Sequence, residues 1–379
     1  MEPRVLFVSK PIAPPWNDGS KNLVRDVANH LVRAKPTVMT TAGGPALGPR
    51  VAMDEVYTEP GKFAPGLAQN ARVVGRLLTD SGHDVWHFVF APNPASSSVA
   101  RASIRGRRMF GWKGRVVQTV ASAPRDFDGV AGLLFGDAIV CVSEWMRGRL
   151  MGSGVRKPVR VIPPCVEAPR KPVVEAIRAT RVALDVPQDA PIVLYPGDYE
   201  VSRGAATVAK AVAAIVRAAP SAFVVFACRA KAPKSAEART AVENDLRAAG
   251  LLDKTRHAGD VPDMPALLAA SSVVAFPVDD LYGKVDVPLV LLEAMALGVP
   301  IVVAAGGPLE ALSHARFVEP ADPDGLAAAC IAYLAKGRAS EDAAKAGKAL
   351  FAARFSPAVA AAAYDDLYAE LLAAPADGD

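Results

Sequence analysis

Short apolar runs alternate with helical patterns along the whole chain of 379 residues. In the first half, runs typical of buried strands fall at 5–8, 37–41, 84–90, 115–120, 138–142 and 159–162. Helical patterns separate them, notably at 21–32, 66–78 and 145–151. Continuous apolar strands joined through helices form parallel sheets that are covered on both faces. The first half therefore predicts one doubly wound α/β domain.

The second half restarts the same pattern. Its strand candidates are 192–195, 223–228, 273–276, 301–303 and 315–318, with helices at 207–218, 235–249 and 264–270. The join is rich in proline, with Pro163, Pro164, Pro169, Pro172, Pro187 and Pro191. We therefore expect a first Rossmann-like domain over residues 1–168 and a second over 169–356. Ligands of such domains bind at the carboxyl ends of the strands, so we expect the site in the cleft between the two domains.

The chain ends in one more helical pattern, at 357–372. Its apolar face is formed by Tyr364, Leu367, Tyr368 and Leu371. We assign residues 357–379 to a C-terminal segment that packs as a helix.

Composition excludes some classes of protein. Apolar residues make up 51% and charged residues 22%, which permits large cores and excludes disorder. The net charge of +4 is spread along the chain, which favours anionic ligands but gives no nucleic-acid footprint. Four scattered cysteines lack metal-ligand spacing and indicate reduced thiols in a cytoplasmic protein. No apolar run reaches ~18 residues, so we expect no membrane-spanning helix, and peripheral contact with the inner membrane face stays open.

The most specific stretch is 286–300, which reads DVPLVLLEAMALGVP. Leu289 to Leu297 predicts a helix, Pro288 suits its first turn, and Gly298 ends it. The amides at the helix start, including those of Val287 and Leu289, form an anion site. Glu293 is a lone carboxylate about one turn in, and burying it unpaired is costly. A sugar diol would satisfy it.

This stretch resembles the donor-site signature of GT-B glycosyltransferases, in particular the large retaining family four. That signature contains two Glu separated by seven residues. The second corresponds to Glu293, which the resemblance implies holds the nucleotide ribose. The first falls at Val285, so we expect Asp286, one position later, to bind sugar hydroxyls instead. The resemblance also implies that the C-terminal helix crosses back onto the first domain.

The first strand leads into a loop with Gly19, Ser20 and Lys21. Glycine lets the backbone approach a ligand, and Asp18 or Ser20 can cap the helix that follows. The family has a Gly-rich loop here that touches the donor diphosphate. We therefore predict that Gly19, Ser20 and Lys21 bind the donor.

The second domain opens with YPGDYEVSRG at 195–204. This resembles the family's phosphate clamp, with Arg203 at the usual Lys position and Asp198 where the family has Arg. A guanidinium binds diphosphate oxygens in bidentate fashion. Arg203 is thus a predicted catalytic and donor-binding residue, and Lys284 and Arg229 are candidates for the missing half of the clamp.

His87, late in a buried strand, is the remaining catalytic candidate, with a core histidine as the alternative. The second family histidine is replaced by Val89, and a further one after Thr119 is absent. Two Asp-x-Asp patterns, at Asp126 and at Asp322, are interpreted as structural. No cluster has metal-site spacing. The resemblance implies that no metal is needed, and we expect no cofactor apart from the donor substrate.

Together these features predict a glycosyltransferase that moves a sugar from a nucleoside-diphosphate sugar to an acceptor hydroxyl. Retention and metal independence come from the resemblance alone. The alternative is a weak or inactive GT-B protein that only binds a nucleotide sugar, which the absent histidines and Asp198 favour. A Rossmann dehydrogenase would carry Gly-x-Gly-x-x-Gly after the first strand, where this chain has a Pro-rich loop. The acceptor stays open among a lipid-linked molecule, a polysaccharide and a small metabolite.

Overall fold

A computed structural model describes residues 2–16, 18–59, 65–229, 233–335 and 337–375. The chain forms two compact units. Unit 1 comprises Met1–Glu167, Tyr282–Pro288 and Arg354–Asp379, and unit 2 comprises Ala168–Leu281 and Leu289–Ala353. This division places the short segment Tyr282–Pro288, which the sequence assigned to the second domain, in unit 1.

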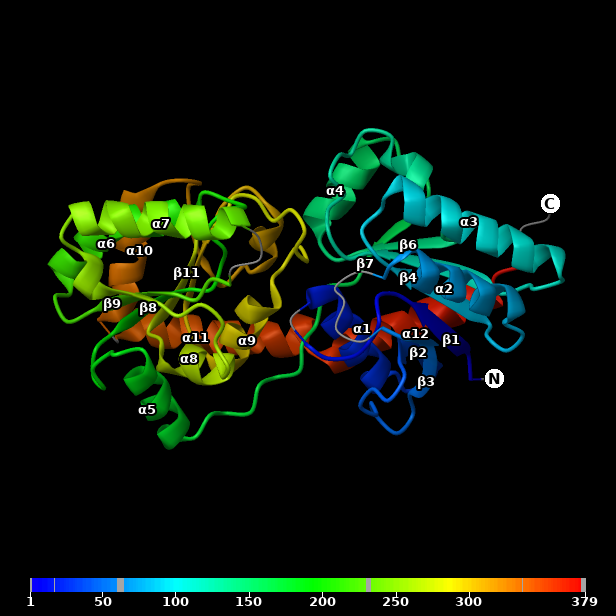
Figure 1. Ribbon diagram of the computed structural model, residues 1–379, viewed down its shortest axis with the longest axis horizontal. Helices are drawn as coiled ribbons and strands as arrows, with labels where there is room; N and C mark the ends of the chain where they lie inside the picture. Colours follow the sequence, from blue (N-terminus) through cyan, green and yellow to red (C-terminus); the bar gives the residue numbers. More distant parts are fainter. Residues whose placement is uncertain (1, 17, 60–64, 230–232, 336, 376–379) are drawn as a thin grey trace. The chain divides into compact units, whose positions relative to one another are not determined.

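Unit 1 is built on a parallel sheet of seven strands in the order β3-β2-β1-β4-β5-β6-β7 (Figure 1). The strands are β1 (Arg4–Val8), β2 (Lys35–Thr41), β3 (Ala52–Tyr57), β4 (Val85–Val89), β5 (Arg115–Val120), β6 (Ala138–Cys141) and β7 (Val159–Val161). The interior strand β1 pairs with β2 on one side and with β4 on the other. The strand order reverses at β1 and β4, as in a doubly wound fold.

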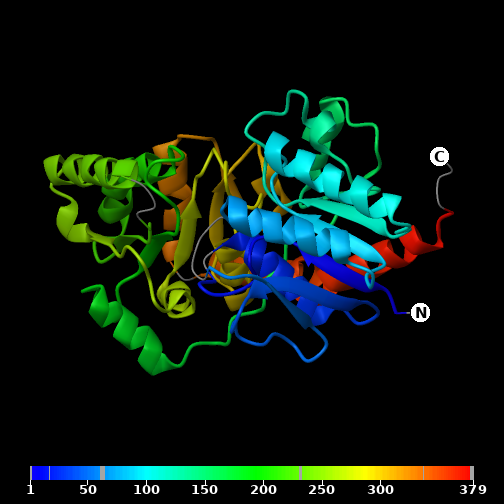
Figure 2. The same ribbon diagram turned by 45° about the vertical axis from the view of Figure 1, so that its right-hand side comes forward.

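Helices cover both faces of this sheet because successive residues of each strand point to opposite sides. Val5 and Phe7 of β1 join a core cluster with α1 (Gly19–His30) and α12 (Pro357–Ala373). Leu6 and Val8 join a second cluster with α2 (Leu67–Thr79) and α3 (Pro94–Met109). A third cluster packs α4 (Glu144–Gly152) and a short 3-10 helix, Val130–Leu133, against β6. Figure 2 gives a second view of these layers.

The C-terminal helix α12 belongs to unit 1, so the expected return of the chain to the first domain is confirmed. Tyr364, Leu367 and Tyr368 of its predicted apolar face are buried against the sheet. Asp365, which is 3% exposed, accepts hydrogen bonds from the amides of Val32, Arg33 and Ala34 at distances of 2.9, 3.0 and 2.9 Å. A carboxylate thus fixes the helix to the turn between α1 and β2.

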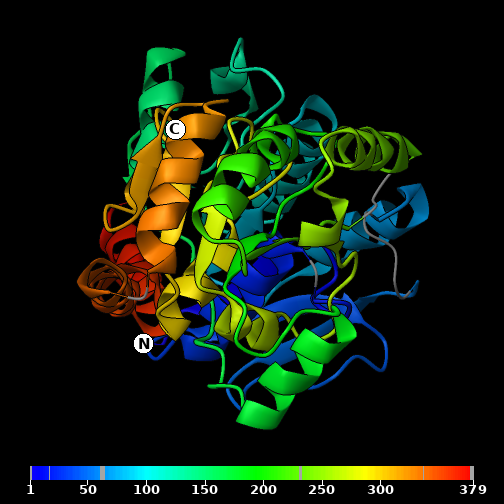
Figure 3. The same ribbon diagram turned by 90° about the vertical axis from the view of Figure 1, so that its left-hand side faces the viewer.

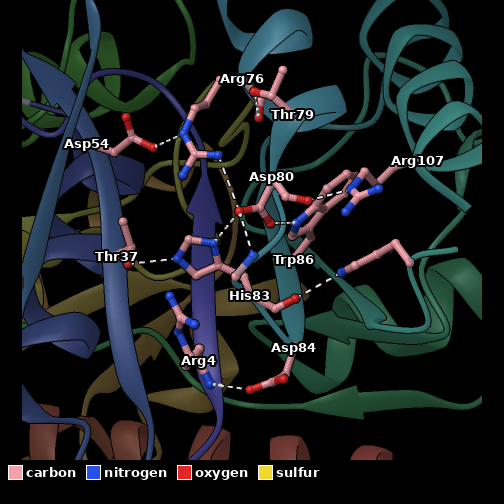
Figure 4. Close-up of polar contacts among 12 residues, drawn as sticks. Arg4, Thr37, Asp54, Arg76, Thr79, Asp80, His83, Asp84, Trp86 and Arg107 are labelled. Atoms are coloured by element: carbon pink, nitrogen blue, oxygen red, sulfur yellow. Dashed lines mark hydrogen bonds and ion pairs between the residues drawn. The ribbon is translucent and has the colours of Figure 1, made fainter. Parts of the chain in front are cut away.

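A buried polar network ties α2, β2 and β4 together around Asp80 (Figure 4). One oxygen of Asp80 accepts from His83 Nδ1 at 2.8 Å and from Arg76 at 3.2 Å, and the other accepts from Trp86 Nε1 at 2.8 Å. Burial alone would raise the pKa of Asp80, but these hydrogen bonds outweigh burial and hold the pKa well below its usual range. The Gly82 backbone amide also donates to this carboxylate at 3.4 Å, and all of these partners belong to unit 1, so the network serves the fold.

Unit 2 contains a parallel sheet of six strands in the order β10-β9-β8-β11-β12-β13. The strands are β8 (Ile192–Tyr195), β9 (Phe223–Phe226), β10 (Thr255–His257), β11 (Val273–Phe276), β12 (Ile301–Ala304) and β13 (Arg316–Val318). Its strand order reverses between β8 and β11, which are direct neighbours. Both units are therefore Rossmann-like, and the predicted fold class is confirmed.

Unit 2 also has helices on both faces (Figure 3). Helix α6 (Gly204–Ala218) packs against α7 (Pro233–Ala248) and α10 (Pro323–Leu334). Helix α9 (Leu289–Leu297) packs against α8 (Met264–Ala270) and α11 (Arg338–Leu350), and α5 (Val174–Ala183) contacts α8. No helix in the described ranges is long and apolar enough to cross a membrane.

The elements that the sequence patterns did not place include β3, β10, α3, α5 and α11. The first three were missed for physical reasons. Strand β3 lies at the sheet edge and pairs only with β2, so it tolerates Asp54 and Glu55. Strand β10 has only three residues, and α3 is too rich in Ser and Arg to show an apolar period. Helix α1 begins two residues before the expected start because Asp18 caps it, accepting from the amides of Ser20 and Lys21.

Candidate active site

The reversal of strand order in unit 2 defines where a ligand of a doubly wound sheet binds. The strands β8 and β11 are direct neighbours at the point where the strand order reverses. In doubly wound sheets, ligands bind at the carboxyl ends of the strands at this point. The loop 196–203 follows β8 and leads into α6, and the loop after β11 contains Asp279. The predicted phosphate clamp lies at this position.

Close packing shapes the loop after β8. Tyr195 is fully buried, and its hydroxyl donates to the Asp198 carbonyl at 2.9 Å. A Cβ at Gly197 would stand 2.2 Å from Tyr195 Cζ, and one at Gly204 would stand 2.7 Å from the Tyr195 hydroxyl. Two glycines are therefore needed for the loop to fold over the ring. The two glycines of this loop are therefore explained by packing against Tyr195.

Arg203 is the N-cap residue of α6 and is held by Asp279. Its backbone amide donates to Asp279 Oδ1 at 3.1 Å, and its Nε donates to Oδ2 at 2.6 Å. Burial alone would raise the pKa of Asp279, but the hydrogen bonds from Arg203 outweigh it and lower the pKa. The Arg203 side chain is 65% exposed, so its Nη groups stay accessible to an anion. The amide of Gly204, the first of α6, donates to the Ser202 hydroxyl at 3.1 Å. A phosphate at Arg203 would therefore face the amides that follow Gly204.

Arg229 and Glu293 belong to the same unit. Arg229 follows β9, and its Nε lies 3.9 Å from Asp260 Oδ1, a weak ion pair. Glu293 is half-buried on α9, between the buried Leu292 and Ala294. Helix α9 ends as predicted, because Gly298 has a φ of +78° and its amide donates to the Met295 carbonyl at 3.0 Å.

Asp286 lies in unit 1, where the Ser143 hydroxyl donates a hydrogen bond to its carboxylate. Asp286 is 2% exposed, and burial raises its pKa to about 6 against the lowering effect of Ser143. The neighbouring Val285 forms an antiparallel bridge with Ser122 and joins the core of unit 1. This burial argues against the predicted contact with sugar hydroxyls, because one oxygen is bound to protein and the residue is shielded from solvent.

Other predicted donor residues surround the start of α9. Val287 is buried, and Lys284, Pro288 and Leu289 are half-buried. Leu289 is the first residue of α9 and belongs to unit 2, whereas the other three belong to unit 1.

The first loop of unit 1 forms the predicted helix cap, but Lys21 is directed into the protein. Asp18 Oδ1 accepts from the amide and hydroxyl of Ser20, and Gly19 begins α1, so the capped turn forms as expected. Lys21, however, is 9% exposed, and its Nζ donates to the Pro15 carbonyl at 3.3 Å. Burial lowers the pKa of Lys21. We therefore correct the prediction that Lys21 binds the donor, because its ammonium is turned into the protein.

His87 is a core histidine. It is 1% exposed, its Nδ1 lies 2.7 Å from the Tyr368 hydroxyl, and its Nε2 lies 2.7 Å from Thr119 Oγ1. Burial lowers its pKa to about 3, so the ring is neutral at physiological pH. Both ring nitrogens thus serve packing between the sheet and α12, which corrects the prediction of a catalytic His87.

The two acidic patterns have structural roles, as interpreted from the sequence. Asp322 caps α10 by accepting from the Gly325 amide at 2.9 Å, and Asp126 accepts from the Asp128 amide at 3.0 Å. Within the part of the chain that the structure describes, no group of three or more His, Cys, Asp or Glu side chains is placed to hold a metal ion.

Sequence reasoning missed Asp279 and Ser143. Asp279 follows a predicted strand at its carboxyl end, which is a usable signal for a site residue. Ser143 stands just before Glu144 and a helical pattern, which signals an N-cap, and the Met146 amide indeed donates to its hydroxyl at 3.0 Å. Nothing in the sequence around Ser143 indicates its contact with Asp286, which is 143 positions away.

Two family models match the chain. Residues 190–336 match glycosyl transferases group 1, and residues 17–170 match glycosyltransferase family 4. No protein of curated function matches the sequence significantly.

Several solved structures share the fold. Sucrose-phosphate synthase from Thermosynechococcus elongatus superposes with a TM-score of 0.74 at 20% identity, covering 99% of this chain and 100% of that one. HepE from Anabaena, solved with UDP and glucose, gives 0.72 at 16% identity over 99% and 100%. An α,α-trehalose-phosphate synthase (UDP-forming) from Burkholderia xenovorans, solved with glucose-6-phosphate, gives 0.69 at 13% over 98% and 100%. With both halves matched by family models and the GT-B fold along its whole length, the chain belongs to the group 1 glycosyltransferases.

Proposed function

We propose that this glycosyltransferase transfers a sugar from a nucleoside-diphosphate sugar to an acceptor hydroxyl. The observation that carries the proposal is the placement of Arg203 at the start of α6 and at the switch point of unit 2, fixed there by Asp279. Two solved neighbours support UDP as the nucleotide, since HepE was solved with UDP-glucose and the trehalose-phosphate synthase is UDP-forming.

In this mechanism, negative charge develops on the diphosphate as it leaves the anomeric carbon. Arg203 and the first amides of α6 would meet that charge, and so would the amide of Leu289 at the start of α9. A prepositioned donor of this kind contributes about 3–4 kcal/mol to transition-state stabilisation. Asp279 holds Nε of Arg203, so the guanidinium is oriented before the donor arrives.

Glu293 is proposed to bind the ribose of the nucleotide. It is the one acidic residue on the apolar helix α9, where it is half-buried, and it matches the second Glu of the family signature. Gly19, Ser20, Arg229, Lys284, Val287 and Pro288 stay predictions as donor contacts. We propose retention of anomeric configuration without a metal, following the family resemblance.

Asp286 receives a different role from the one its position in the signature suggests. Its carboxylate is bound by Ser143, so we propose that it positions the segment Tyr282–Pro288 ahead of α9. The acceptor stays open among a lipid-linked molecule, a polysaccharide and a small metabolite. The four cysteines are free and buried, which supports a reducing, cytoplasmic location.

Binding measured by calorimetry tests the donor site. Arg203→Ala should weaken UDP by about tenfold to a hundredfold and leave uridine unchanged, because a charge-assisted contact to phosphate is worth about 1.5–3 kcal/mol. Arg217→Ala is the matched control, since Arg217 lies in the last turn of the same helix. Equal weakening of UDP and uridine by Arg203→Ala would contradict the clamp.

Glu293→Ala should weaken uridine and UDP alike, because the ribose is common to both. Unchanged uridine binding would contradict the ribose role. Release of sugar from UDP-sugars, with the anomeric configuration of the product read by NMR, then separates an active enzyme from a protein that only binds the donor.

A further inference from the structure

The C-terminal end of α3 exposes two large apolar side chains. Met109 is 86% exposed and Phe110 is 75% exposed. Most large apolar residues of unit 1 are buried, so a neighbouring pair of this exposure is unusual for a surface that faces only water.

The turn that carries this pair is well anchored. The Phe110 amide donates to the Arg107 carbonyl at 3.1 Å, and the Gly111 amide donates to the Arg108 carbonyl at 2.9 Å. Trp112 follows, stacks on Trp86 at 4.2 Å between ring centroids, and is 8% exposed. The backbone is therefore held on the core while the two preceding side chains face solvent.

Basic residues lie next to Met109 and Phe110, and the segment that contains them has no acidic residue. From Pro94 to Arg125 the sequence contains no Asp or Glu, and its basic residues are Arg101, Arg105, Arg107, Arg108, Lys113, Arg115 and Arg125. Arg105, Arg108 and Lys113 are exposed next to Met109 and Phe110. Among the described residues, Asp137 faces this segment, with its carboxylate 3.3 Å from Arg108.

A third apolar side chain extends the surface onto α2. Leu78 is 38% exposed, and a Cβ at Gly106 of α3 would stand 2.9 Å from its Cδ2. We call the surface formed by Leu78, Arg105, Arg108, Met109, Phe110 and Lys113 the α3 tip. It directly precedes β5, so it lies at the amino edge of the sheet, away from the carboxyl ends that bind ligands (Figures 1 and 2).

We propose that the α3 tip docks unit 1 on an anionic lipid surface. Met109 and Phe110 match the boundary between headgroups and acyl chains, and the cations match lipid phosphates. A nucleic acid would use the charge but would gain little from Met109. This inference does not depend on the sugar-transfer proposal. The α3 tip lies at the amino edge of the sheet, whereas the predicted donor contacts Gly19 and Ser20 follow the carboxyl end of β1.

Cosedimentation of the full chain with phosphatidylcholine vesicles, with and without phosphatidylglycerol, tests the proposal. The protein should bind the anionic vesicles and leave the neutral ones largely unbound. Binding should fall with added salt, because the surface charge is then screened. Equal binding to both vesicles, or binding to neither, would overturn the proposal.

Variants separate the apolar and charged parts. Met109→Ser with Phe110→Ser should weaken vesicle binding by at least about tenfold, and Arg105→Gln with Lys113→Gln should weaken it by about fivefold per charge. Leu67→Ser is the matched control, because Leu67 is 91% exposed at the opposite end of α2. Unchanged melting temperatures and unchanged UDP binding verify that each variant is folded.

One outcome points to another partner. If the charge variant loses binding while the Met109 and Phe110 variant binds as the wild type does, the tip is a polyanion site and the membrane proposal is wrong.

Discussion

The Ser143 hydroxyl donates a hydrogen bond to the Asp286 carboxylate although 143 positions separate them in the chain. The same hydroxyl accepts from the Met146 amide and so caps α4. One side chain thus fixes both the start of a helix and a segment that enters unit 1 from far along the sequence. Asp286, which the sequence predicted to bind sugar hydroxyls, therefore has a structural partner within unit 1.

The burial of Asp286 predicts a specific pH dependence of stability. Its pKa rises from 3.8 to about 6 on folding, so the folded state prefers the protonated carboxyl. The stabilising effect of the proton is complete below the unfolded pKa and is lost as pH rises through about 6. At neutral pH the cost is on the order of 2–3 kcal/mol.

Asp286→Asn should remove this dependence, because an amide has no charge to bury and can still accept from Ser143. Urea denaturation of both proteins between pH of about 4 and about 7 measures it. Parallel curves for wild type and variant would show that Asp286 does not titrate as proposed.

Ser143→Ala should destabilise unit 1 by about 2–4 kcal/mol, because it removes the helix cap and leaves a buried carboxylate without its donor. Ser143→Thr keeps the hydroxyl and should cost about 1 kcal/mol or less. Hydrogen exchange in the first turn of α4 measures the loss of the cap, and exchange in residues 282–288 measures the loss of the contact with Asp286. Faster exchange in α4 alone would mean that the contact with Asp286 contributes little.

Gly197→Ala should destabilise unit 2 by about 2–3 kcal/mol or more, because the new methyl group would overlap the buried Tyr195 ring. Gly148→Ala is the control, since nothing lies within 4 Å of the added carbon in α4. It should be neutral or stabilise the protein by up to about 1 kcal/mol. Thermal melting compares the two, and equal melting temperatures would show that the loop accommodates the methyl group.

Asp365→Asn should release α12 from the turn between α1 and β2. An amide offers one acceptor oxygen and would turn its NH₂ toward the remaining donors, at a cost of about 2–4 kcal/mol. Asp366→Asn is a neighbouring control, because Asp366 pairs with Arg33 where both side chains are more than half exposed, which is worth at most about 1 kcal/mol.

Hydrogen exchange at Val32, Arg33 and Ala34 measures this difference directly, because these amides are the donors. Exchange that is equally slow in both variants would show that Asp365 does not hold the turn.

Local patterns carried much of the fold. Apolar runs placed β5, β8 and β11 with the bounds that the structure shows, and the helical pattern did the same for α8 and α9. The strands are continuous apolar runs, and α9 consists mostly of straight-chain residues and Ala, so the local sequence is enough to predict their conformation. Gly298 ended α9 as expected because only a residue without a side chain adopts its positive φ at low cost. Tyr364 and Tyr368 of the predicted apolar face of α12 are buried as expected.

Side-chain environments were decided by the tertiary structure. His87 and Lys21 have residue types that suit catalysis and phosphate binding, yet Tyr368, Thr119 and the Pro15 carbonyl surround their polar atoms. Arg203 gained its partner Asp279 from a loop 76 positions away. Residue type and local spacing determine which secondary structure a segment prefers. Whether a polar atom meets protein or solvent depends on segments distant in sequence, and only the folded chain brings those together.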